Sequence, residues 1–127
     1  MAHSDTDIQI IIPMTGEGSR FKGAGYQRLK PFICIHDRPM IEWVVRLFPE
    51  DEHQIRFVCR QDHLDTVPYM APTLQQIAPS AEILTVHDWV KKGPVYDILN
   101  VADSIHDDRP VLISYCDYYM HWNYKKF

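Results

Sequence analysis

A glycine-rich turn and two nearby cations near the N-terminus are the residues of this chain best suited to bind an anion. The turn covers residues 15–19, Thr-Gly-Glu-Gly-Ser, and Arg20 follows it directly. Glycine has no Cβ, so backbone N–H groups in such a turn can approach an oxyanion closely. Arg20 can bind phosphate oxygens through two N–H groups, and Lys30 adds a point charge. The combination predicts a site for the phosphates of a small ligand.

The spacing of the glycines excludes two familiar phosphate-binding loops. The dinucleotide fingerprint G-x-G-x-x-G requires a third glycine where this chain has Phe21. An acidic residue does follow at about the right distance, but this residue, Asp37, lies in a His-Asp-Arg-Pro turn instead of at a strand end. The P-loop pattern G-x-x-x-x-G-K-[S/T] does not occur in the sequence.

Strands and helices alternate in the sequence pattern that must position these residues. An apolar run over 8–14 predicts a strand that is buried on both faces and leads into the glycine turn. Further strands are expected at 54–59, 82–87 and 110–116, with helices at 39–48, over 61–78 in two pieces broken near Pro68 and Pro72, and at 95–105. This alternation predicts a Rossmann-like three-layer α/β/α fold with a mostly parallel sheet.

Polar segments follow three of the expected strands. They are the loop at 15–31, the loop at 88–94, which contains Gly93, and Asp117 after the last strand. In parallel α/β sheets, ligands bind beyond the carboxyl ends of the strands, so these segments are expected to share one rim. A carboxylate there suits a Mg²⁺ ion that bridges phosphate oxygens. An ordinary turn or helix-cap role for Asp117 is the alternative.

Composition and charge restrict the class of protein. A chain of 127 residues fits one domain, here residues 1–127, and 46% apolar with 24% charged residues is typical of globular proteins. The net charge of −4 argues against a nucleic-acid partner, whereas a local balance of +3 over 15–31 favours a small anionic ligand. No apolar run is long enough for a membrane span and the N-terminus is polar, so a cytoplasmic location is expected.

Cysteine and histidine show no pattern that would indicate metal binding or covalent catalysis. We expect Cys34, Cys59 and Cys116 to be buried free thiols of a reducing compartment. The seven histidines lack zinc-ligand spacing and are expected in surface or turn positions. No nucleophile with an adjacent base is evident either.

With these motifs assembled, the sequence resembles the sugar-1-phosphate nucleotidyltransferases. The likeness is greatest to the NTP-transferase-like proteins of capsular and cell-surface polysaccharide biosynthesis. The matching stretches are residues 13–21, Lys30 with Pro31, residues 39–43, and residues 115–119 with Trp122. Two departures are Thr15, where the family usually has Ala, and Leu29, where Pro is common.

The resemblance implies where a nucleotide would bind. The fold would be the nucleotide-binding N-terminal part of a longer nucleotidyltransferase domain, of the type shared with GT-A glycosyltransferases. Gly16 and Gly18 would hold the triphosphate, with the Ser19 hydroxyl beside them. Met14 and Thr15 would lie near the base and ribose. Gly93 would approach the nucleoside from the loop after the third strand.

The resemblance also implies a reaction. A phosphate oxygen of a phosphorylated sugar would attack the α-phosphorus of an NTP in line and release pyrophosphate. Arg20 would stabilise charge on the phosphates, Lys30 would contact the α-phosphate or the sugar phosphate, and Asp117 would bind Mg²⁺. In such a reaction the protein positions the reactants and stabilises charge, so no nucleophilic side chain is needed.

Two other functions remain open. The first is a non-catalytic nucleotide-binding or assembly module, because the family's sugar-binding half and second metal carboxylate are expected beyond residue 127. The second is a GT-A glycosyltransferase, although its usual Asp-x-Asp motif is replaced here by Asp117-Tyr118-Tyr119. A truncated sheet would expose an apolar edge that a partner usually covers, so homo-oligomers are expected.

Overall fold

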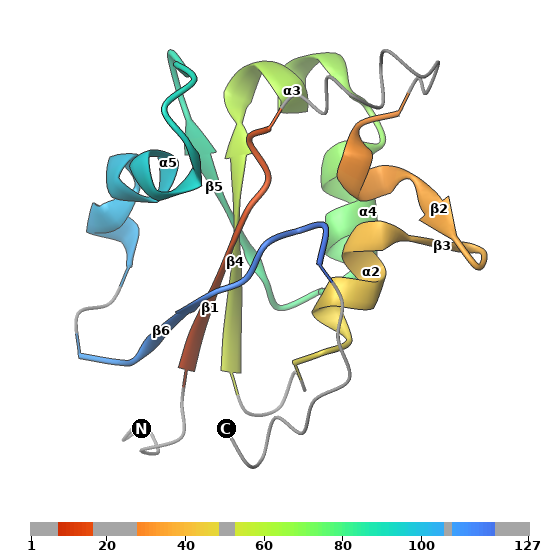
Figure 1. Cartoon of the computed structure of the whole chain (residues 1–127), viewed down its shortest axis with the longest axis horizontal. Helices are drawn as coiled ribbons and strands as arrows, with labels where there is room; N and C mark the ends of the chain where they lie inside the picture. The colour runs from red at the N-terminus through yellow and green to blue at the C-terminus, as the bar shows by residue number, and fades with distance from the viewer. Residues whose placement is uncertain (1–7, 17–27, 49–52, 106–107, 119–127) are drawn as a thin grey trace.

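A four-stranded parallel sheet is the centre of the molecule (Figure 1). The computed structural model describes residues 8–16, 28–48, 53–105 and 108–118. The sheet has the order β5-β4-β1-β6 and consists of β1 (Ile8–Pro13), β4 (His53–Arg60), β5 (Glu82–Val86) and β6 (Val111–Ile113). All three neighbouring pairs run parallel. The predicted α/β fold with a mostly parallel sheet is therefore confirmed.

Strand β1 is buried on both faces, as its continuous apolar run predicts. Ile10 and Ile12 belong to one core cluster, and Ile11 belongs to a second cluster with Val58 and Ile98. The first cluster includes residues of α2 (Met40–Val45) and α4 (Met70–Ile77), whereas the second includes residues of α5 (Pro94–Asn100). Helices thus cover the two opposite faces of the sheet, with α5 on one side and α2 and α4 on the other (Figure 1).

A short hairpin precedes α2. Its strands β2 (Cys34–Ile35) and β3 (Arg38–Pro39) pair antiparallel, and a 3₁₀ turn, η1 (Lys30–Phe32), leads into it. His36 and Asp37 between the strands have φ angles of 50° and 65°. Positive φ at both central residues is characteristic of a type I′ hairpin turn. The helix expected at 39–48 accordingly begins one residue later, because Pro39 pairs in β3, and it ends at Val45.

Several other expected boundaries were wrong for identifiable reasons. The helix break expected near Pro68 is present and separates α3 (Gln61–Thr66) from α4. The second break, expected near Pro72, was wrong, because α4 continues through that residue. It lies in the first turn of α4, where a backbone N–H has no partner inside the helix to lose. The helix expected at 95–105 ends at Asn100, and η3 (Ala102–Ser104) follows it. The strand expected at 110–116 pairs only over Val111–Ile113.

The cysteine and histidine expectations hold only in part. All three cysteines are free thiols, and Cys59 is buried, but Cys116 is only half-buried and Cys34 is exposed. Cys34 was expected to be buried because apolar residues flank it; its strand, however, belongs to the two-stranded hairpin and not to the central sheet, and both of its residues are exposed. His63 lies in α3 and is buried, contrary to the expectation of a surface position.

A buried arginine links three strands of the sheet. Arg56 of β4 is 1% exposed and donates hydrogen bonds to Gln9 Oε1 at 2.8 Å and to Gln54 Oε1 at 2.9 Å. Its Nε lies 3.2 Å from Glu82 Oε2 of β5. A buried guanidinium costs free energy unless acceptors surround it, and here β1, β4 and β5 supply them.

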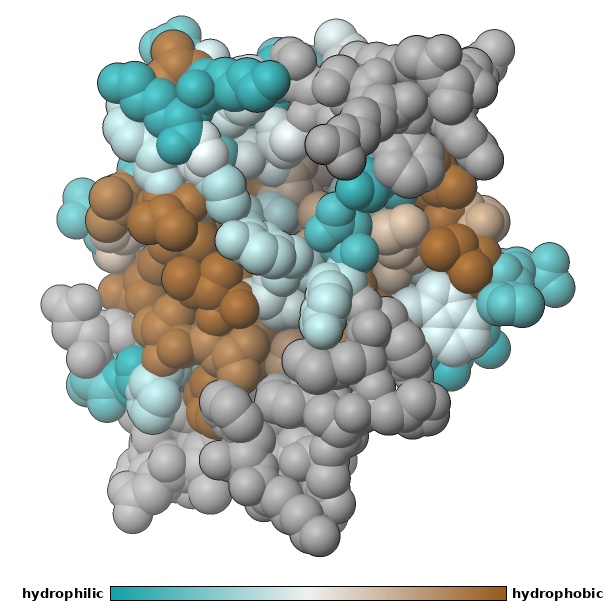
Figure 2. All heavy atoms as spheres, in the orientation of Figure 1, coloured by the Kyte–Doolittle hydropathy of each residue, from teal (hydrophilic) through white to brown (hydrophobic). Residues whose placement is uncertain are grey.

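One face of the molecule is strongly apolar. Apolar side chains gather on the left of Figure 2, over α5 and β6. The exposed large apolar residues of these elements are Val95, Leu99, Val111 and Ile113. None of the helices in the described part of the chain is long and apolar enough to cross a membrane.

Candidate functional site

The end of β1 delivers two predicted nucleotide-binding residues to the carboxyl rim of the sheet. Met14 is buried, and its N–H donates to Val58 O at 2.8 Å, which keeps the chain beside β4. Thr15 is 4% exposed, whereas Gly16 is exposed. A Cβ at Gly16 would meet no atom within 4 Å. Local packing therefore does not require glycine there, and the open space leaves its backbone accessible to a ligand.

Lys30 and Asp117 form an ion pair at the same rim. Lys30 Nζ lies 2.6 Å from Asp117 Oδ2, and the two side chains are 33% and 34% exposed. Lys30 opens η1, which is anchored by the buried side chains of Pro31 and Phe32, and Asp117 follows β6. The structure therefore brings together the cation and the carboxylate that the sequence placed in two separate loops.

Gly93 lies immediately before α5 in a conformation that favours glycine. Its φ of 95° lies in the left-handed region, which side chains with a Cβ rarely adopt. The same residue's carbonyl accepts a hydrogen bond from the Asp97 N–H at 3.3 Å. Its backbone is thus fixed at the start of the helix.

A buried carboxylate that was not expected from the sequence lies between these segments. Asp97, in the first turn of α5, is 1% exposed. Its Oδ2 accepts hydrogen bonds from the Thr15 hydroxyl and from Trp89 Nε1, the latter at 3.2 Å. Its Oδ1 is buried, and none of the residues that the structure describes forms a hydrogen bond with it. Acidic residues are common in exposed first turns, so the sequence carried no sign of this burial.

Solved structures share this fold. A UDP-glucose pyrophosphorylase complexed with UDP-glucose superimposes with a TM-score of 0.63 at 18% identity, covering 87% of this chain and 46% of its own. The chain has the fold of a sugar nucleotidyltransferase. A UDP-glucose pyrophosphorylase from Acinetobacter baumannii gives a TM-score of 0.62 at 22% identity over 87% of this chain and 45% of its own. A nucleoside-diphosphate-sugar pyrophosphorylase from Vibrio cholerae RC9 gives a TM-score of 0.61 at 20% identity, over 85% of this chain and 47% of its own.

The similarity to these solved structures is one of fold, and it extends over part of each matched protein. The chain spans about half the length of the solved structures that it matches. No protein-family model matches the sequence, and no curated protein matches it.

Part of the expected site of this nucleotidyltransferase fold lies outside the described residues, namely Gly18, Ser19 and Arg20. Within the described ranges, no cluster of three or more His, Cys, Asp or Glu side chains is placed to hold a metal ion. Asp117 therefore offers a metal one protein carboxylate.

Cys116, which precedes Asp117, is not poised for chemistry. Burial and, to a smaller extent, the neighbouring charge of Asp117 together raise the pKa of its thiol to about 12. At neutral pH the group is therefore a thiol, and neither a thiolate ligand nor a nucleophile.

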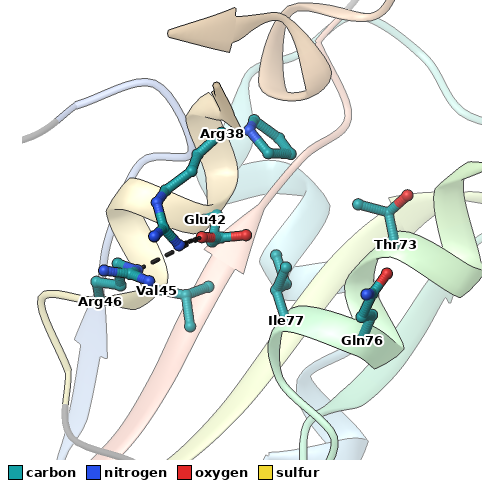
Figure 3. A pocket seen from close by; sticks show the side chains of 8 residues that line it. Arg38, Glu42, Val45, Arg46, Thr73, Gln76 and Ile77 are labelled. Atoms are coloured by element: carbon teal, nitrogen blue, oxygen red, sulfur yellow. Dashed lines mark hydrogen bonds and ion pairs between the residues drawn. The ribbon is translucent and has the colours of Figure 1, made fainter. Parts of the chain in front are cut away.

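Two hollows differ in their relation to the rim of the nucleotidyltransferase fold. One of about 260 Å³ borders the ion pair, and its lining includes Ile35, His36, Met40, Trp43 and Asp117. A larger one, of about 420 Å³, lies between α2 and α4 (Figure 3). In the larger hollow Arg38 and Arg46 both turn toward Glu42 and pair with it, so much of its charge is already compensated. The hollow beside Asp117 is the better candidate for a substrate.

Proposed function

We propose that this chain is the nucleotide-binding part of a Mg²⁺-dependent sugar nucleotidyltransferase. The enzyme would transfer a nucleotidyl group from an NTP to a sugar 1-phosphate, or to a similar phosphorylated acceptor, and release pyrophosphate. The observation that supports this most is the contact of Lys30 with Asp117. It brings the cation proposed to bind phosphate and the carboxylate proposed to bind the metal to one rim of a sheet with a nucleotidyltransferase fold.

In this proposal Lys30 acts by charge. Its side chain is one-third exposed, so a phosphate oxygen can reach it without rearrangement of the core. Two negatively charged phosphates must approach each other in nucleotidyl transfer, and a fixed cation lowers that repulsion. Arg20 and the backbone N–H groups at Gly16 and Gly18 would hold the rest of the triphosphate.

Asp117 suits magnesium. Mg²⁺ in phosphate-transferring sites is usually bound by one or two carboxylates, with substrate phosphates and waters completing its shell. A single accessible carboxylate beside a phosphate-binding lysine fits that pattern. When bound, the ion would neutralise charge on the phosphate oxygens.

The nucleoside would lie between the end of β1 and the loop before α5. The hydrogen bond from Thr15 to Asp97 holds these two segments together. Met14, Thr15 and Gly93 would then line the base and ribose. Two of the matched structures are named UDP-glucose pyrophosphorylase, so a uridine nucleotide is the first to test. A cytoplasmic role in surface polysaccharide biosynthesis belongs to the same proposal.

Calorimetric titration with the four common NTPs, with and without Mg²⁺, tests the proposal. Replacing Arg20 or Lys30 by Ala should weaken NTP binding about a hundredfold, because each removes charge-assisted hydrogen bonds. Asp117→Asn should abolish the effect of Mg²⁺ on affinity. Arg46→Ala is the matched control, since the Arg46 side chain, just after the end of α2, is 52% exposed and pairs with Glu42. Unchanged NTP affinity in both Arg20→Ala and Lys30→Ala would refute the phosphate-binding role.

A non-catalytic nucleotide-binding module is the second candidate. The chain aligns with 46% of the matched UDP-glucose pyrophosphorylase. Pyrophosphate release from an NTP and sugar 1-phosphates separates the two functions. Turnover supports the enzyme, and tight NTP binding without pyrophosphate release supports the module.

A further inference from the structure

The buried Asp97 connects the two loops that would hold a nucleotide. Its carboxylate accepts a hydrogen bond from the hydroxyl of Thr15, which lies where the chain leaves β1. Its own backbone N–H donates to the carbonyl of Gly93 at 3.3 Å, in the loop between β5 and α5. One residue thus contacts the start of the phosphate-binding turn through its side chain and the nucleoside loop through its backbone.

Packing alone does not account for an aspartate at this position. Asp97 is 1% exposed, and its Oδ1 has no partner within the described part of the chain. A buried polar atom without a partner costs free energy, and an apolar side chain in such a place is often neutral or stabilising. Ile98 beside it and Ile11 on the sheet are apolar core residues. The carboxylate therefore weakens the core locally, and its benefit must lie elsewhere.

We propose that Asp97 is a positioning residue that holds Thr15 and the Gly93 loop in one arrangement, so that the triphosphate and nucleoside parts of a ligand meet a single preformed site. This inference rests on the proposed nucleotide-binding function. A preformed site spares the ligand the cost of ordering two loops when it binds. Without the link, each half of the nucleotide still finds its own loop, but the intact nucleotide loses the advantage of binding both together.

The test compares an intact nucleotide with its two halves. The probes are UTP, uridine and inorganic tripolyphosphate in the presence of Mg²⁺, or the corresponding pair for whichever NTP the wild type binds best. Thr15→Val, which keeps the shape of the side chain but removes the donor, should weaken UTP binding about tenfold or more. Tripolyphosphate should change by less than about threefold. Asp97→Ala should behave in the same way. Uridine is compared in Asp97→Ala, because Thr15 itself would line the base and ribose, and its affinity there should also change by less than about threefold.

Two variants separate the link from general damage. Thr15→Ser retains the hydroxyl and should recover the UTP affinity that Thr15→Val loses. Trp89→Phe removes the other donor to the same Asp97 oxygen, but Trp89 lies in the nucleoside loop itself and does not bridge the two loops. Trp89→Phe should therefore keep the ratio of UTP affinity to the affinities of the halves.

Each outcome decides the matter. Equal weakening of all three probes, or unchanged UTP binding in Thr15→Val and Asp97→Ala, overturns the positioning role and leaves the proposed function standing. A wild-type chain that binds no NTP overturns both. If Asp97→Ala does not fold, the isosteric Thr15→Val still provides the comparison.

Discussion

The Lys30–Asp117 pair shows how a contact can matter for binding and little for stability. Both side chains are about one-third exposed, so water and salt screen their attraction. The pair cancels two charges at the rim when no ligand is present. A phosphate that binds Lys30 would release Asp117 from the pair, and a cation that binds Asp117 would release Lys30. Binding of either ligand would therefore favour binding of the other. The value of the pair therefore lies in the groups that can replace each partner.

At the residue scale, we predict that alkaline pH destabilises the protein through Cys59. Burial and, to a smaller extent, nearby Cys116 together raise the pKa of this thiol from 9.0 to about 12. Above pH 9 the unfolded chain releases this proton while the folded chain keeps it, so stability falls as the pH rises from 9 toward 12. For Cys59 alone the loss should reach about 1 kcal/mol at pH 10.

Urea unfolding at pH 8 and pH 10 measures this loss. In Cys59→Ala the difference between the two pH values should shrink by about that amount, while Cys34→Ala, which alters the exposed cysteine, should leave it unchanged. If the unfolding free energy changed equally between pH 8 and pH 10 in Cys59→Ala and in the wild type, the loss could not be attributed to Cys59.

Sequence patterns located some residues of the rim better than others. Lys30 and Asp117 could be brought together from the sequence because parallel strands send their carboxyl ends to one edge. Asp97 could not, because its role depends on Thr15 and Trp89 lying within hydrogen-bond reach, and no local spacing encodes that contact. The exposure of Cys34 was missed for a similar reason, since it depends on which layer the hairpin joins.

At the element scale, we predict that the β2–β3 hairpin can be stabilised at its turn. His36 and Asp37 both adopt positive φ, which costs free energy for any residue with a Cβ. Replacing the pair by Asn-Gly, the preferred type I′ sequence, should raise the free energy of unfolding by about 1 kcal/mol. Thermal unfolding measures the change.

The control for the hairpin is a glycine at a position of ordinary backbone geometry. Thr73→Gly in α4 should lower the melting temperature, because it adds flexibility without relieving strain. A lower melting temperature in the Asn-Gly variant would show that His36 or Asp37 makes a side-chain contribution larger than the backbone strain.

The length and burial of an element decided how well it could be predicted. Strand β1 was recognised because an unbroken apolar run has few alternatives, and three of its four isoleucines are fully buried. The two-residue strands β2 and β3 are too short to produce a periodic pattern. Pro72 was misread because proline is excluded from helix interiors but accepted in the first turn, and the sequence does not show where that turn begins.

At the scale of the whole molecule, we predict self-association through the β6 edge. Among the strands that the structure describes, β6 pairs with β1 alone, and its Val111 and Ile113 are 45% and 47% exposed. An apolar strand at the edge of a sheet favours pairing with another chain. Sedimentation velocity should show a concentration-dependent dimer, and Ile113→Lys should weaken dimerisation about tenfold or more.

Ile35→Lys is the matched control for the edge. Ile35 has a similar exposure, 42%, but lies in the hairpin and not at the edge of the four-stranded sheet. It should leave the dimer unchanged. A wild-type chain that stays monomeric at high concentration, or equal effects of the two lysine variants, would contradict assembly through β6.

The buried Arg56 has a consequence for how the chain avoids folding incorrectly. Side chains alternate between the faces of a sheet, so a slip of β4 by one residue against β1 would turn Arg56 toward the face that now holds Ile55 and Phe57. There the guanidinium would lose Gln9 and Glu82 as acceptors, a penalty of several kcal/mol. A purely apolar β4 would tolerate such a slip far better. The arginine therefore discriminates against misaligned sheets while the chain is still assembling.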